Sequence, residues 1–133
     1  MASKKEVKST MTGLELKYEV LLVYLVSILG FIFSFIKNPN VSEDARFHYK
    51  QSGATFIVYT GLAIVESIFA SIATAMMFTP AFGLSVVLWI LIVMISLLEV
   101  AVVVFAVITI VKAFNNQKYE IPVISKLANA IWK

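Results

Sequence analysis

Cysteine is absent from this 133-residue chain, which contains a single histidine and a single aspartate. The absence of cysteine excludes a disulfide framework and thiolate chemistry. One histidine with one or two carboxylates rarely closes a metal coordination shell, and haem would lack a second histidine or a cysteine as axial ligand. Nucleophilic triads are nearly excluded by the same shortage. We therefore expect no catalytic residue, no metal site and no cofactor, and we predict that the protein is not an enzyme.

Charge is scarce as well. Only 14% of the residues are charged and 60% are hydrophobic, whereas about a quarter are charged in soluble domains. Residues 20–36 carry no charge, and Glu66 and Glu99 are the only charged residues between Lys50 and Lys112. About 20 apolar residues in a helix cross the ~30 Å hydrocarbon layer. A chain of this length cannot supply a core that would bury such runs, so the sequence predicts an all-α integral membrane protein.

Turn signals divide the apolar sequence into three predicted transmembrane helices, at residues 18–36, 54–78 and 84–111. Pro39 disfavours helix at the preceding residue and therefore ends the first span. The 79–83 segment, Thr-Pro-Ala-Phe-Gly, separates the other two. No small-residue cleavage site follows the first apolar run, so we interpret it as a retained span and not as a signal peptide.

Polar segments complete a single membrane domain over residues 18–133, which follows a polar tail at 1–17. Ser42 precedes two acids, a pattern typical of a helix N-cap, and predicts an interfacial helix at 42–52 before the second span. Residues 119–133 form a predicted amphipathic segment suited to the membrane surface. Its apolar stripe consists of Ile124, Leu127, Ala128 and Ile131.

The distribution of cations predicts the orientation, because cytoplasmic segments carry an excess of lysine and arginine. Three spans would place the termini on opposite sides of the membrane. Four cations then share a side with the 79–83 turn: Lys4, Lys5, Lys8 and Lys17. Seven share the other: Lys37, Arg46, Lys50, Lys112, Lys118, Lys126 and Lys133. We therefore predict a multi-pass cell-membrane protein with the first loop and the C-terminus in the cytoplasm.

Glu66 and Glu99 form a predicted intramembrane acid pair. As helices, the second and third spans would place them ~22 Å and ~27 Å from the turn, so their depths differ by only ~5 Å. An acid at mid-bilayer costs ~2.5–3.5 kcal/mol, so neither should face lipid. Neither span contains a basic residue, which favours a protonated or proton-sharing pair. The pair could be a hydrogen bond that fixes helix register, a proton or cation site, or a contact to a basic group of a partner.

Two short polar motifs flank the second and third spans. The first is Phe-His-x-x-Gln, at Phe47, His48 and Gln51. The second is Lys-Ala followed by Tyr-x-x-Pro, at Lys112, Ala113, Tyr119 and Pro122. Both resemble motifs of a family of small bacterial membrane proteins related to the twenty-kilodalton membrane component of the chloroplast inner-envelope protein translocon. The resemblance implies a helical membrane protein without enzyme chemistry of its own.

The first motif has two physical interpretations. On an interfacial helix, Asp44 and His48 are i, i+4 neighbours, so local pairing and headgroup contact would suffice, with Phe47 dipping into lipid. Alternatively, His48 and Gln51 form a polar clamp that hydrogen-bonds the C-terminal segment near Tyr119.

Two classes of function remain open. The first is a non-enzymatic scaffold or accessory subunit of a membrane complex, translocon-like, with protein partners in the membrane. Small residues that permit close helix approach crowd one side of the second span: Ala63, Ser67, Ala70, Ser71, Thr74 and Ala75. The alternative is a small oligomeric proton- or cation-coupled carrier that uses Glu66 and Glu99. The cations flank the spans, where lipid headgroups account for them, so we expect no nucleic-acid partner.

Overall fold

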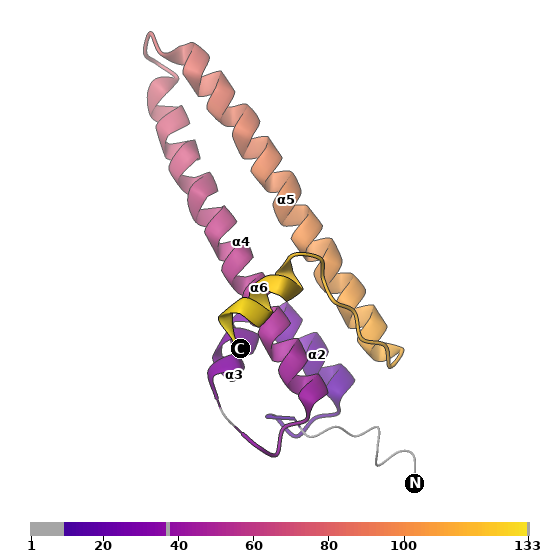
Figure 1. The fold of residues 1–133 in the computed structure, drawn as a ribbon. Coiled ribbons are helices and arrows are strands. Elements are labelled where there is room, and N and C mark those ends of the chain that lie inside the picture. The colour runs from indigo at the N-terminus through magenta and orange to yellow at the C-terminus, as the bar shows by residue number, and fades with distance from the viewer. Residues whose placement is uncertain (1–9, 37, 133) are drawn as a thin grey trace. The chain divides into compact units, whose positions relative to one another are not determined.

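The computed structural model describes residues 10–36 and 38–132, and these ranges are helical without any strand (Figure 1). The helices are α2 (Leu16–Leu25), α3 (Ser27–Phe35), α4 (Glu43–Met76), α5 (Phe82–Phe114) and α6 (Ile124–Ile131). The prediction of an all-α protein is therefore confirmed. Five of the cations counted for the orientation lie outside the described residues: Lys4, Lys5, Lys8, Lys37 and Lys133.

Two helices in the described ranges, α4 and α5, are long and apolar enough to cross a membrane. The prediction of three spanning helices is wrong. Residues 18–36 do not form one helix, because α2 and α3 meet at Val26 with a bend of 111°. A third crossing would require this bent pair to act as one broken span.

Tertiary contacts explain the break, since Val26 is neither proline nor glycine. The Ser52 hydroxyl of α4 donates a hydrogen bond to the Val23 carbonyl, which lies in the last turn of α2, where carbonyls lack partners within their own helix. A Cβ at Gly30 of α3 would overlap the Ser52 side chain. A residue of α4 therefore stabilises the bend. The apolar pattern of residues 18–36 contains no information about that contact.

The predicted division of the next helix near Gly53 is also wrong, because α4 runs without interruption from Glu43 to Met76. Its start agrees with the predicted cap, since the Ala45 N–H donates to Ser42 Oγ at 3.2 Å. A Cβ at Gly53 would lie 2.8 Å from the Trp132 ring and 3.0 Å from Phe31 Cα. Glycine is needed here for close packing, and the predicted interfacial helix at 42–52 is simply the first part of α4.

The C-terminal helix α6 buries part of the predicted apolar stripe. Ile124 and Ala128 of the stripe are buried, as is the neighbouring Ser125, whereas Ile131 is exposed. Trp132 follows the helix and places its ring 6.2 Å and 5.6 Å from the rings of Phe31 and Phe35. Figure 1 shows α6 lying across the first part of α4. The buried part of this segment therefore packs against protein.

The chain divides into two compact units. Unit 1 comprises Met1–Ile57 and Val104–Lys133, and unit 2 comprises Val58–Val103. Unit 2 is an antiparallel hairpin of α4 and α5, and the connection between them contains the predicted turn at Thr79 and Pro80. Ser85 Oγ donates to the Ala73 carbonyl at 2.7 Å and thereby joins the two helices near the turn.

Candidate functional site

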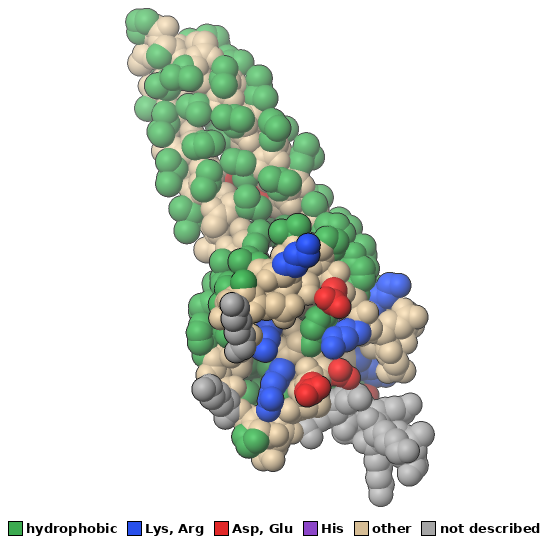
Figure 2. Space-filling view, in the orientation of Figure 1, with side chains coloured by type: hydrophobic (Ala, Val, Ile, Leu, Met, Phe, Trp, Pro, Cys, Tyr) green, Lys and Arg blue, Asp and Glu red, His purple; other side chains and the backbone are tan. Residues whose placement is uncertain are grey.

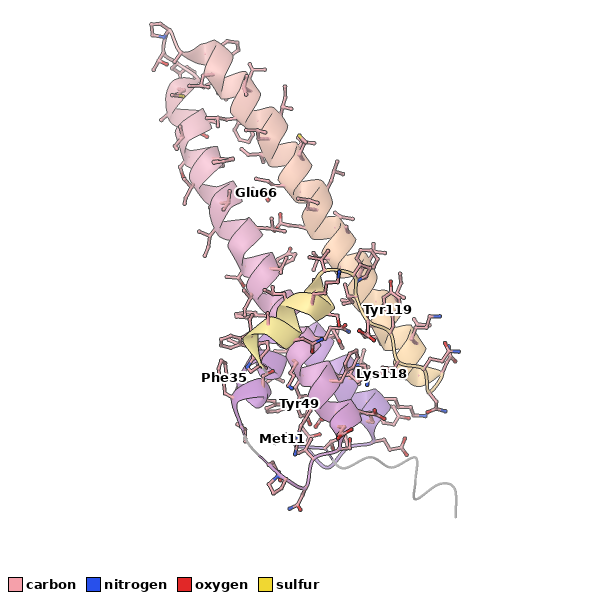
Figure 3. The ribbon with its side chains drawn as sticks, viewed as in Figure 1. Met11, Phe35, Tyr49, Glu66, Lys118 and Tyr119 are labelled. Atoms are coloured by element: carbon pink, nitrogen blue, oxygen red, sulfur yellow. The ribbon has the colours of Figure 1, made fainter. Side chains whose placement is uncertain are left out.

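Gln51 is the centre of a buried polar cluster in unit 1, with a relative exposure of 1%. Its Nε2 donates to the Tyr24 hydroxyl at 2.7 Å and to the Tyr119 carbonyl at 3.1 Å. Its Oε1 accepts from the Ile121 N–H at 2.9 Å. A buried amide is destabilising unless its groups are hydrogen-bonded. These three bonds therefore tie the segment between α5 and α6, where Figure 3 labels Tyr119, to α4 and α2.

His48 lies beside this cluster and is also buried. Its Nδ1 is 3.5 Å from the Tyr24 hydroxyl oxygen. That hydroxyl accepts a hydrogen bond from Gln51, so its own proton is available to Nδ1. The structure thus brings Gln51 together with the C-terminal segment near Tyr119, whereas the hydrogen-bonding partner shown for His48 is on α2.

A second buried polar contact involves Glu19, which sequence reasoning missed. Its carboxylate accepts from the Tyr49 hydroxyl and from both the N–H and the hydroxyl of Thr12, at 2.8 Å and 2.7 Å. The Tyr49 hydroxyl in turn accepts from the Met11 N–H at 2.9 Å, and Figure 3 labels both residues. The available signal was an acid directly before an uncharged run, but that position is equally typical of the edge of a membrane span.

The remaining residues of the two motifs, such as Phe47 and Lys112, make contacts within unit 1. Lys118 Nζ lies 4.4 Å from the centre of the Phe47 ring and 3.9 Å from Asp44 Oδ1. A cation therefore lies over one face of the Phe47 ring. The Lys112 carbonyl accepts from the Gln117 N–H at 2.8 Å and closes the end of α5.

The connection to α6 begins beyond that point. The Pro122 carbonyl accepts from the Ile124 N–H at 2.7 Å, and Val123 between them has a φ of 69°. Pro122 therefore helps to shape the turn that leads into α6.

Glu66 and Glu99 meet in unit 2. The Glu99 and Glu66 carboxyls are close enough to interact electrostatically, and Glu66 Oε1 accepts a hydrogen bond from Ser96 Oγ at 3.2 Å. Figure 3 labels Glu66 on α4. Both acids are only half-buried within the hairpin. In the described ranges, no three His, Cys, Asp or Glu side chains are grouped closely enough to hold a metal ion.

Residues 6–128 match the model of the MamF/MmsF family, described as the magnetosome magnetite crystal formation protein family. No curated protein and no solved structure is significantly similar to the chain. The match and the two apolar helices identify a membrane protein.

This match shows that the proposed resemblance to a translocon-related family is wrong. The motif residues Gln51 and Tyr119 make contacts that hold helices together. Short motifs of this kind describe packing and do not distinguish one family of small helical membrane proteins from another. The match supports neither a translocon-like role nor a carrier.

Proposed function

The chain belongs to the MamF/MmsF family of magnetosome proteins, and from this premise we propose that it is a non-enzymatic accessory protein of the magnetosome membrane that contributes to magnetite crystal formation. The observation that carries the proposal is the family match over residues 6–128, nearly the whole chain. The contacts within each unit support a structural and not a chemical contribution.

Unit 1 supports the non-enzymatic part of the proposal. Gln51 and Glu19 direct their hydrogen-bonding groups to the protein backbone and to neighbouring hydroxyls. Catalysis requires groups that meet a substrate. In this proposal the buried polar groups instead fix the fold of unit 1.

Unit 2 is proposed as the membrane-inserted part. Most of its large hydrophobic side chains are exposed, as the green surface of the hairpin in Figure 2 illustrates. Its only charged residues are Glu66 and Glu99, for which we propose a structural contact between α4 and α5. Such contacts between polar side chains stabilise helix pairs in membranes modestly, by ~0.6 kcal/mol on average.

The orientation is proposed from the cations. All eleven lysines and arginines lie outside residues 51–111. If α4 and α5 both cross the membrane, the segments that precede α4 and follow α5 share one side. The positive-inside rule then favours the cytoplasm for these segments and the opposite side for the turn at Thr79.

Replacement of the chain in a magnetosome-forming host tests the function. A tagged wild-type copy should co-purify with magnetosome membranes. Deletion of the native gene should change the size distribution of magnetite crystals in electron micrographs. A tagged Gln117→Leu copy, altered at an exposed glutamine, should restore the wild-type distribution. Absence from purified magnetosomes together with unchanged crystals would rule the proposal out.

A further inference from the structure

A pocket of ~280 Å³ lies within unit 1 between the first part of α4 and α6. Its α4 wall includes Glu43, Arg46 and Lys50, and its α6 wall includes Ser125 and Asn129. Ligand pockets begin at about this size, ~300 Å³. The cavity can therefore hold a small polar group.

The charge of the lining favours an anion. Arg46 and Lys50 are i, i+4 neighbours and thus share one face of α4. Arg46 Nη2 donates to the Asn38 carbonyl at 2.8 Å, which uses one of the five guanidinium N–H donors and restrains the group. Glu43 is the one carboxylate in the lining, so the two cations exceed the acidic charge. Asn129 adds amide donors from the opposite wall.

The position of the two cations along α4 indicates the kind of anion. Lys50 is the last charged residue of α4 before Glu66. With a rise of ~1.5 Å per residue, Lys50 and Arg46 lie ~6 Å and ~12 Å along the helix axis before Ala54, the first residue of the predicted second span. The polar headgroup layer extends ~5–8 Å beyond the hydrocarbon on each side. An α4 that crosses the bilayer thus brings Lys50 to the level of lipid phosphates and places Arg46 about one helical turn beyond it, within reach of a long side chain.

We propose that this pocket binds the phosphate of an anionic lipid headgroup. Arg46 and Lys50 contact the phosphate oxygens, because guanidinium and ammonium groups form charge-assisted hydrogen bonds with phosphate. Asn129 contacts the polar part of the headgroup beyond the phosphate. The lipid is held at the contact between α4 and α6, so binding also stabilises the docked C-terminal helix.

The test uses the full-length protein in a neutral detergent and three probes: short-chain phosphatidylglycerol, short-chain phosphatidylcholine and inorganic phosphate. Binding is measured by native mass spectrometry and by the shift in thermal unfolding midpoint. Phosphatidylglycerol should bind more tightly than either other probe. Equal binding of phosphatidylcholine would overturn the anion preference, and equal binding of inorganic phosphate would overturn the assignment to a lipid.

Variants locate the site. Arg46→Gln and Lys50→Gln should each weaken phosphatidylglycerol binding about fivefold, and the double variant about 25-fold, as expected for basic groups near anionic lipid. Lys126→Gln removes the same charge from an exposed position of α6 outside the pocket lining, and should leave the affinity unchanged. Lys50→Arg, which keeps the charge and the fold, should retain most of the binding. A loss with Lys126→Gln as large as with Lys50→Gln would overturn the pocket in favour of diffuse attraction.

Discussion

The two units are stabilised in opposite ways. Unit 1 buries several polar side chains, including Glu19, His48 and Gln51, and hydrogen-bonds them across segments distant in sequence. In unit 2, most large hydrophobic side chains are exposed, and the buried ones are few, such as Ile92 and Val102. The comparison indicates that specific internal contacts determine unit 1, whereas the surrounding lipid must provide the solvent that makes unit 2 stable.

The largest expected effect comes from Gln51→Leu. The change removes three hydrogen bonds and leaves the Tyr119 carbonyl and the Ile121 N–H without partners. Unpaired buried groups cost ~1–3 kcal/mol each, so the two orphaned groups should lower the unfolding free energy of unit 1 by ~2–6 kcal/mol. Chemical denaturation in detergent, followed by the fluorescence of Trp132 in a Trp89→Phe background, measures the loss.

Gln117→Leu is the matched control, because Gln117 is exposed and its substitution should change stability by less than ~0.5 kcal/mol. Similar effects of the two substitutions would mean that the buried cluster does not stabilise unit 1.

A pair of glycine substitutions sharpens the comparison between the units. Gly30→Ala in unit 1 should destabilise by ~1–3 kcal/mol, because the added methyl overlaps Ser52. Gly61→Ala in unit 2 meets no atom within 4 Å and should be neutral or stabilising by up to ~1 kcal/mol, since alanine favours helix. Thermal unfolding of both variants, and of Gly30→Ala combined with Ser52→Gly, measures these effects.

Partial recovery of stability in the Gly30→Ala, Ser52→Gly protein would locate the strain at this contact. Equal destabilisation by the two single alanine substitutions would contradict the difference in packing between the units.

The smallest effect concerns the acid pair. Glu66→Gln and Ser96→Ala should each be tolerated, with a coupling of ~0.6 kcal/mol in a double-mutant cycle measured in lipid. A coupling indistinguishable from zero would show that the Ser96 hydrogen bond to Glu66 contributes nothing to the register of α4 and α5.

The difference between local sequence signals and contacts distant in sequence explains which parts of the structure could be predicted. Apolar runs and turn residues define α4 and α5, and Ser42 marks the start of α4, because these signals are local. The bend at Val26 depends on Ser52, and the burial of Glu19 depends on Tyr49. Both partners are contributed by a segment about 30 residues away, so hydrophobic periodicity carries no information about them.

The contacts of the candidate site were likewise predictable only in part. The polar clamp near Tyr119 follows from placing two motifs on one face of the membrane, and Gln51 does reach that segment. The partner of His48 does not follow, because Tyr24 lies in a predicted span whose bend the sequence does not reveal.

Single-cysteine labelling tests the two-span account most directly, since the natural chain contains no cysteine. Leu14→Cys, Ser42→Cys, Ala81→Cys and Gln117→Cys variants are treated with a membrane-impermeant maleimide in intact purified magnetosomes, whose outer surface faces the cytoplasm. The account predicts labelling at positions 14, 42 and 117 and protection at position 81. Labelling at 42 and 117 with protection at both 14 and 81 would mean that α2 and α3 together cross the membrane, and would contradict the account.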